Sequence, residues 1–245
     1  MAATHSPLAQ FEITPIFKLP ELLGYDIAFT NSSLFMVIAV AAIWLFFALS
    51  MRKATLIPSR MQSVAESTYS FVANTVRENA GHGSEKFFPL VFSLFLFVLF
   101  ANLIGMLPYA FTVTSHVVIT FALAILVFFA VTLVAIFKHG PLKFLASFLP
   151  EGTPWWMAPM MYFIELFSYL ARPVSLSVRL AANMIAGHTM LKVIAGFVVM
   201  LGAAGIAPMA LLVVLTGFEV FIAILQAYIF TVLTCVYLNS ALHLH

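Results

Sequence analysis

Two arginines and a histidine lie inside a long apolar segment, residues 157–201, and they constrain this chain more than any other feature. The segment carries Arg172, Arg179 and His188 in surroundings that are otherwise typical of a membrane helix. An arginine at the centre of a bilayer costs at least about 2.5 kcal/mol, so such a side chain pairs, lines water or performs a function. We therefore expect the function of the chain to depend on these residues.

The composition indicates an all-α, polytopic membrane protein. Of the 245 residues, 63% are hydrophobic and only 8% are charged, whereas a soluble domain has about a quarter charged residues. The net charge of +2, with no basic run and no glycine-rich phosphate loop, argues against nucleic-acid binding. The single cysteine, Cys235, excludes a disulfide within the chain and a cysteine metal site. We predict no cofactor and no metal.

Five apolar runs predict five membrane helices. They cover residues 34–49, 87–106, 115–137, 157–201 and 207–242. Between the first two runs, polar residues recur at helical spacing over residues 58–80. This pattern predicts an amphipathic helix along the membrane or against a partner, with an ordinary loop helix as the alternative. We divide the chain into an extramembrane N-terminal segment, 1–30, and a single helical membrane domain, 31–245.

The last two apolar runs are much longer than the roughly 20 residues that a perpendicular membrane helix needs. Either they break, with Pro173 as the candidate position, or they lie steeply tilted. A steep tilt needs packing against a neighbour to hold it. We expect these two helices to form an antiparallel hairpin that wraps the outside of a large partner in the membrane.

Basic residues in the links between spans predict the orientation. Five of them lie between spans one and two: Arg52, Lys53, Arg60, Arg77 and Lys86. Lys138 and Lys143 lie between spans three and four, and the other two links carry no lysine or arginine. With the N-terminus outside and the C-terminus inside, both links that carry basic residues lie on the inner side, and both links without them lie on the outer side.

Helical spacing sorts the polar groups of the last two spans. Glu165, Arg172, Arg179 and Asn183 belong to one stripe with steps of three or four residues, together with serines. His188 lies nine residues after Arg179, which places it on the other face. In the last span, Glu219 and Gln226 share a stripe.

An antiparallel hairpin would also fix the level of each group in the membrane. Arg179 and Gln226 fall at the centres of their spans, so they would lie level with one another. His188 would come level with the neighbourhood of Glu219, on the outer side, and Glu165 would lie on the inner side. A proton relay interrupted by a permanent positive charge would have this arrangement, because a guanidinium does not give up its proton.

Several of these groups have simpler interpretations. Arg179 could be a structural cation paired with Glu219 or Glu165, and Glu165 could be an interfacial residue in contact with water. Arg172 could snorkel or pair with Glu165. Asn183 could serve merely as a hydrogen-bonding contact between two helices. His188 beside Glu219 suits proton transfer better than metal binding, because two ligands make a poor metal site. His116, near the outer end of span three, has no assigned role.

Two sequence motifs resemble the a subunit of the rotary ATP synthase membrane sector. The first is Arg179-Leu180-Ala181-Ala182-Asn183-Met184-Ile185-Ala186-Gly187-His188. The second runs from Phe218-Glu219-Val220 to Leu225-Gln226-Ala227-Tyr228-Ile229-Phe230. The resemblance covers the chain from about span two to its C-terminus. Some bacterial members have an acid at the position of His188 and a histidine at that of Glu219. The reverse arrangement of this chain resembles the alphaproteobacterial and mitochondrial branch.

The resemblance implies a proton-conducting stator subunit beside a ring of c subunits, with b-type peripheral stalk subunits as further partners. It implies that Arg179 is the essential arginine, which keeps passing ring carboxylates deprotonated and blocks a proton short circuit. Asn183, His188, Glu219 and Gln226 match positions tied to the outer half-channel and to the interface with the c ring, and Glu165 matches an acidic position tied to the inner half-channel. Arg172 replaces a lysine of some members. The expected location is a bacterial inner membrane, with the mitochondrial inner membrane as the alternative.

Two other function classes remain to be weighed. A stand-alone channel or carrier predicts ion conduction by the purified chain without a ring. A membrane hydrolase is disfavoured, because the sequence has no His-Glu-x-x-His and no Gly-x-Ser-x-Gly motif. We likewise expect no nucleotide-hydrolysing site in this chain. Copurification of a small, very apolar protein in many copies would favour the stator subunit.

Overall fold

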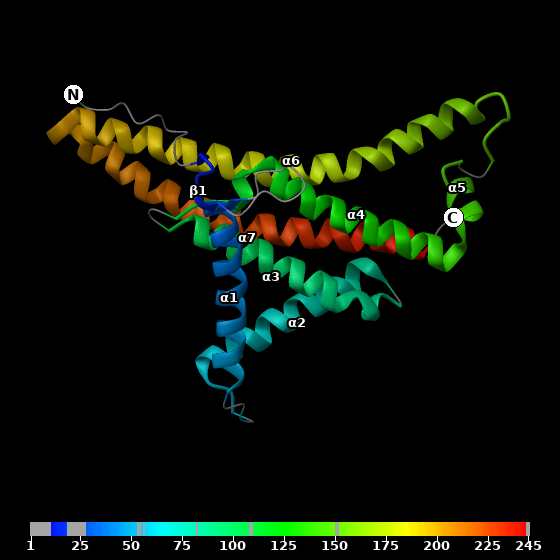
Figure 1. Cartoon of the computed structure of the whole chain (residues 1–245), viewed down its shortest axis with the longest axis horizontal. Helices are drawn as coiled ribbons and strands as arrows, with labels where there is room; N and C mark the ends of the chain where they lie inside the picture. The colour runs from blue at the N-terminus through cyan, green and yellow to red at the C-terminus, as the bar shows by residue number, and fades with distance from the viewer. Residues whose placement is uncertain are drawn as a thin grey trace. The chain divides into compact units, whose positions relative to one another are not determined.

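The computed structural model consists almost entirely of helices (Figure 1). It describes residues 11–18, 28–52, 55, 57–81, 83–107, 110–149 and 152–243. The α-helices among these residues are α1 Asn31–Met51, α2 Arg60–Ala80, α3 Phe88–Gly105, α4 Val117–His139, α5 Pro141–Ala146, α6 Ala158–Leu201 and α7 Ile206–Leu242. Short 3₁₀ turns η2 Ser84–Phe87, η3 Val113–Ser115 and η4 Gly202–Gly205 lie between them.

Five helices are long and apolar enough to cross a membrane: α1, α3 together with η2, α4, α6 and α7. The five predicted spans are therefore confirmed, with their ends shifted by a few residues, and the chain is an all-α, multi-pass membrane protein. The predicted amphipathic helix is α2. Its first turn is capped by the Ser59 hydroxyl, which accepts a hydrogen bond from the backbone N–H of Gln62 at 3.3 Å.

Helix α6 does not break at Pro173 but continues through it to Leu201. Proline removes one backbone donor from a helix interior, and the neighbouring turns tolerate this loss in apolar surroundings. Of the two alternatives for the excess length of this run, the structure therefore contains the unbroken helix.

The hydrophobic pattern did not predict two short elements. Strands β1 Pro15–Lys18 and β2 Ala28–Thr30 pair antiparallel within the N-terminal segment. Helix α5 begins directly after Gly140, whose φ of +86° suits glycine, with Pro141 at its first position. Residues 1–10 and 19–27 lie outside the described residues, and the division at residue 30 stays a prediction.

The chain packs as two compact units, and α3, α6 and α7 each contribute to both. The first unit comprises Met1–Leu56, Leu96–His116 and Leu180–Ala227. The second comprises Ile57–Phe95, Val117–Arg179 and Tyr228–His245.

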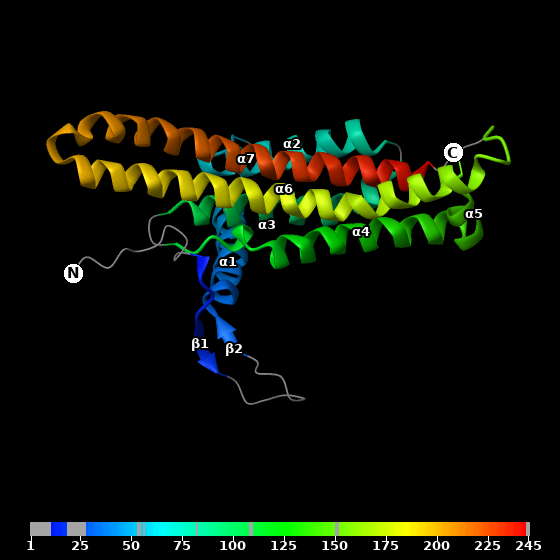
Figure 2. The same cartoon turned by 90° about the horizontal axis from the view of Figure 1, so that it is seen from above.

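In the first unit, the C-terminal half of α6 and the N-terminal half of α7 run side by side and antiparallel (Figure 2). Gly187 leaves room for the side chain of Glu219: a Cβ atom there would lie 2.5 Å from Oε1 of the glutamate. The β1–β2 hairpin lies at the start of α1 in the same unit. The predicted hairpin of two long helices is thus present in this unit.

In the second unit, aromatic side chains join α2 to the first part of α3. The ring of Tyr69 meets those of Phe88 and Phe92 edge-on, at centroid distances of 4.9 and 5.7 Å. At the end of α7, the carbonyl of Leu242 accepts hydrogen bonds from Lys138 Nζ at 2.9 Å and His139 Nε2 at 3.2 Å. Both donors lie in the last turn of α4, so this helix caps the C-terminus of α7.

Candidate proton-path sites

The first unit contains a buried polar group of residues that we call the histidine–glutamate cluster: Asn102, Thr112, Thr114, His188 and Glu219. His188 of α6 and Glu219 of α7 come together as predicted, with Nδ1 of the histidine 3.7 Å from Oε1 of the glutamate. The side chains are 11% and 6% exposed. The contact becomes an ion pair when His188 is protonated, and it lies between two membrane-spanning helices.

Both carboxylate oxygens of Glu219 are buried, and neither has a hydrogen-bond partner among the described residues. A buried carboxylate without hydrogen bonds is costly, whereas its protonated form is tolerated much better. Glu219 is therefore suited to take up and release a proton, with His188 as its neighbour.

Thr112 is hydrogen-bonded to His188. Its hydroxyl lies 3.4 Å from the carbonyl of Gly105, to which it can donate, and 3.1 Å from Nε2 of His188. The direction of the second bond depends on the tautomer of the imidazole. In the neutral tautomer with its hydrogen on Nε2, the lone pair of Nδ1 lies on the side of Glu219.

Asn102 ties the cluster to α7. This residue of α3 is completely buried; its Nδ2 donates to the backbone carbonyl of Ala223 at 3.1 Å. Its Oδ1 accepts a hydrogen bond from the hydroxyl of Thr114 at 2.7 Å. The side-chain amide thus forms two hydrogen bonds in the buried interior of the unit, where its polar atoms need partners from the protein.

Asn183 and Gln226 form a second pair between α6 and α7. Nδ2 of Asn183 donates to Oε1 of Gln226 at 2.8 Å. Gln226 is 1% exposed, and its Nε2 has no hydrogen-bond partner among the described residues. The contact joins two helices, as one interpretation of Asn183 expected, while the exposed Asn183 side chain also reaches the surface.

Arg179 has an exposed side chain in the middle of α6. No ion pair joins it to another residue of the described chain, so it is not paired with Glu219 or Glu165 there. An arginine in a membrane-spanning helix is rarely left without a partner or water. Its guanidinium is therefore available to a group outside this chain.

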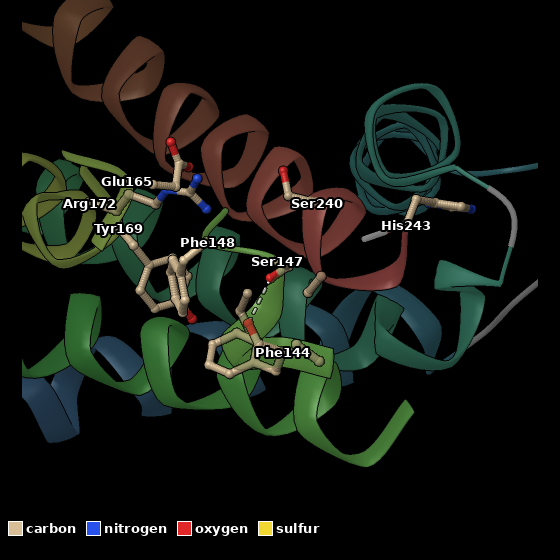
Figure 3. Close-up of a pocket in the computed structure, with 11 residues that line it drawn as sticks. Phe144, Ser147, Phe148, Glu165, Tyr169, Arg172, Ser240 and His243 are labelled. Atoms are coloured by element: carbon tan, nitrogen blue, oxygen red, sulfur yellow. Dashed lines mark hydrogen bonds between the residues drawn. The ribbon is translucent and has the colours of Figure 1, made fainter. Parts of the chain in front are cut away.

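The second unit contains a cavity of about 220 Å³ that we call the arginine cavity (Figure 3). Glu165, Tyr169 and Arg172 project into it from α6, Ser240 lies on α7, and Ser147 follows α5. Glu165 and Ser240 thus line one cavity, which joins the first part of α6 to the end of α7.

Arg172 is held by aromatic rings rather than by Glu165. Its guanidinium carbon lies 5.1 Å from the ring centroid of Tyr169 and 5.3 Å from that of Tyr237. It forms no ion pair with Glu165 within the described residues. The hydroxyl of Tyr169 is in turn hydrogen-bonded to that of Thr132 on α4. The cation–π contacts give Arg172 a fixed position at the wall of the cavity.

His116 lies in the link before α4, outside the membrane-spanning segments. Its ring stacks on that of Phe111 at a centroid distance of 5.0 Å, and burial lowers the pKa of the imidazole. Phe111 also lines a cavity that contains His188. In the described part of the chain, no three His, Cys, Asp or Glu side chains are placed to hold a metal ion.

Sequence reasoning missed seven polar residues of these sites: Asn102, Thr112, Thr114, Thr132, Ser147, Tyr169 and Tyr237. Asn102 had a usable signal, because it is a lone amide within an apolar span. Thr112 and Thr114 lie in a link without periodicity, and nothing in the sequence placed them beside α6 or Asn102. Threonine and tyrosine are common enough in membrane helices that Thr132 and Tyr169 gave no signal.

Comparisons with known proteins agree with the resemblance seen in the motifs. A family model described as ATP synthase A chain matches residues 33–239. A protein named ATP synthase subunit a from Ehrlichia chaffeensis is 54% identical over 241 residues, which cover 98% of this chain and 99% of that protein. One of the same name from Parvibaculum lavamentivorans is 55% identical over 244 residues, 97% of this chain and 93% of that protein.

Proposed function

This chain belongs to the ATP synthase A chain family, and on that premise we propose that it is the proton-conducting stator subunit of a rotary ATP synthase. In this proposal two offset half-channels lead protons to and from the carboxylates of a c-subunit ring. Arg179 faces those carboxylates and separates the two channels.

The observation that carries this proposal is the exposed, unpaired guanidinium of Arg179 among the described residues. Such a charge at mid-membrane calls for an anionic partner that the chain does not itself supply. A ring carboxylate that passes Arg179 would be held deprotonated, because a nearby positive charge stabilises the charged form of an acid. The fixed charge would also stop protons from crossing directly between the channels.

The histidine–glutamate cluster would form the outer half-channel. A proton would arrive at Nδ1 of His188, which lies 3.7 Å from Oε1 of Glu219. A small rotation of either side chain would bring the two atoms within hydrogen-bonding distance. From Glu219 the path would continue along the polar stripe of α7 to Gln226 and its partner Asn183. Asn183 lies four residues after Arg179 on α6. The buried, unsatisfied oxygens of Glu219 support its role as a transient proton carrier.

The arginine cavity would form the inner half-channel. A volume of about 220 Å³ is large enough for several waters, and Glu165, Ser147 and Ser240 offer them hydrogen-bonding partners. Arg172, clamped between two tyrosines, would keep the wall of this cavity positively charged and favour the release of protons.

The proposed partners are the c-subunit ring, b-type peripheral stalk subunits and the lipid bilayer. The chain would lie in a bacterial inner membrane with its N-terminus outside and its C-terminus in the cytoplasm, and the nucleotide chemistry would belong to other subunits. The basic residues in the two inner links support this orientation.

Replacement of Arg179 tests the proposal directly. In the assembled complex, R179A should lower coupled ATP synthesis by at least about a hundredfold, as the loss of a key electrostatic group does in other machines. Membranes that carry the variant without its catalytic sector should leak protons passively, because the barrier between the channels is gone.

The control is R172A, which removes the other arginine of α6 and should leave the barrier intact. Measured synthesis in R179A within twofold of the unaltered complex would contradict the role of Arg179 and with it the stator mechanism. Comparable amounts of assembled complex have to be verified for each variant.

A further inference from the structure

The first unit contains a cavity of about 810 Å³ that leads to His188. Its walls include Gly105 and Phe111 at the end of α3 and in the link after it, and Lys192 and Thr216 from α6 and α7. Glu12 and Thr14 of the N-terminal segment also line the cavity, together with Asn31 and Phe35 of α1. The part of the sequence that showed no motif therefore lies beside the residue expected to receive protons.

Three hydrogen bonds hold this segment in place, all to Asn31 at the start of α1. Oδ1 of Asn31 accepts from the backbone N–H of Thr14 at 3.2 Å, and its Nδ2 donates to the carbonyl of Glu12 at 3.0 Å. The backbone N–H of Asn31 donates to the carbonyl of Thr14 at 3.1 Å. The pairing of β1 with β2 continues from this point.

The anchored segment reaches His188 itself. The ring of Phe11 meets the imidazole edge-on, with the two centroids 6.5 Å apart and the planes at 72°. Edge-to-face contacts of this kind are favourable and restrict the orientation of both rings. Glu12, the next residue, is exposed, so its carboxylate lies at the wall of the cavity with access to solvent.

Among the described residues, three ionisable side chains line this cavity: Glu12, His188 and Lys192. Lys192 lies four residues after His188, on the same face of α6, and its positive charge disfavours the approach of protons. Glu12 is the one acid among the lining residues, and it forms no ion pair with Lys192 in the described chain. The carboxylate therefore has the sign needed to offset the lysine and attract protons.

We propose that Glu12 is the entry carboxylate of the outer half-channel: it attracts protons from outside and passes them through the cavity to His188. This inference rests on the proposed function of the chain. A negative charge in a cleft focuses the field and raises the arrival rate of cations. The benefit should be greatest where protons are scarce, and it should fall as salt screens the charge.

Proton uptake into vesicles tests this role. The complex, freed of its catalytic sector, is reconstituted in liposomes, and the initial rate of proton flux from the outer side is measured against outer pH. We expect E12Q to slow uptake by about threefold to tenfold at alkaline outer pH and much less at acidic pH. The difference should shrink at high salt, and E12D should restore uptake.

Two further variants change the same balance by other means. N31A removes the two side-chain hydrogen bonds of the anchor but keeps the carboxylate, and it should reproduce part of the defect of E12Q. K192Q removes the opposing charge and should accelerate uptake at alkaline outer pH. This second variant also tests the charge balance if E12Q fails to assemble. E78Q, which removes an exposed carboxylate of α2, is the matched control and should behave as the unaltered protein.

The outcomes separate the two proposals. Uptake by E12Q equal to that of the unaltered protein at every pH, while E219Q is blocked, would overturn the role of Glu12 and leave the stator function standing. Conduction by E219Q at the normal rate would contradict the proposed outer path itself. A defect in E12D as large as that in E12Q would show that the segment acts through packing and not through its carboxylate.

Discussion

The two polar sites solve the problem of placing charge in a membrane helix in different ways. The histidine–glutamate cluster is buried, and its hydrogen bonds are formed with neutral groups. Thr112 is bonded to His188, and Thr114 is bonded to Asn102. A cavity of about 810 Å³ reaches His188 from one side. In the smaller arginine cavity, the cation lies against two aromatic rings. A group that exchanges protons is thus fixed by hydrogen bonds, while a permanent charge is held by cation–π contacts.

This difference predicts which substitutions matter most. Hydrogen bonds in a dry interior leave an unsatisfied group behind when one partner is removed, whereas the loss of one of two cation–π contacts beside water leaves the other in place. Variants of the first site should therefore be more damaging than variants of the second.

The largest effect is expected for G187A. A methyl group at this position would lie 2.5 Å from Oε1 of Glu219, so the glutamate or one of the two helices has to move. We expect proton uptake by the complex to fall by at least about tenfold, since small displacements of reacting groups are costly. Combining G187A with E219D, which shortens the acid, should recover part of the loss. G196A, where a Cβ meets nothing within 4 Å, is the control.

A smaller effect is expected for N102A, measured as the thermal stability of the purified complex. The change removes the hydrogen bonds to Ala223 and Thr114 and leaves buried groups unsatisfied, which costs about 1–3 kcal/mol. T114V removes one of these bonds and should cost less. An N102A complex as stable as the unaltered one would show that water replaces the amide, and the cluster would then not be dry.

The smallest effect is expected for Y237L in the arginine cavity. Loss of one ring over Arg172 removes a cation–π contact of about 0.5–1 kcal/mol and leaves Tyr169 in place. Proton release on the inner side, measured in inverted vesicles, should slow by about twofold to threefold. Y237F keeps the ring and should be silent. A defect in Y237L larger than that in G187A would reverse the contrast between the sites.

Hydropathy alone predicted the five spans, because a membrane helix has to satisfy its backbone internally and present apolar side chains to lipid. Helical spacing and an antiparallel hairpin also brought His188 to Glu219, which the structure confirms at 3.7 Å. The sequence also placed Arg179 and Asn183 on one stripe of the helix, and both are exposed in α6. Their functional roles remain proposals.

The rest was beyond the sequence for physical reasons. The partners of Arg172 were predicted to be Glu165 or interfacial water, and they are two tyrosines from different helices. Tyr169 lies three residues before Arg172 on the same helix, but tyrosine is too common there to be singled out. Tyr237 belongs to α7, and spacing along α6 gives no information on it. Likewise, the β-hairpin of the N-terminal segment has no alternating apolar pattern, and its attachment depends on a single asparagine, Asn31.

The close approach at Gly187 also constrains how this family can diversify. A side chain at residue 187 would occupy the space that the side chain of Glu219 now fills. Neither position is free to drift alone, so a lineage that enlarges the first has to shorten or exchange the second in concert. The histories of these two sites should therefore be correlated, and a single unmatched change should be rare among living descendants.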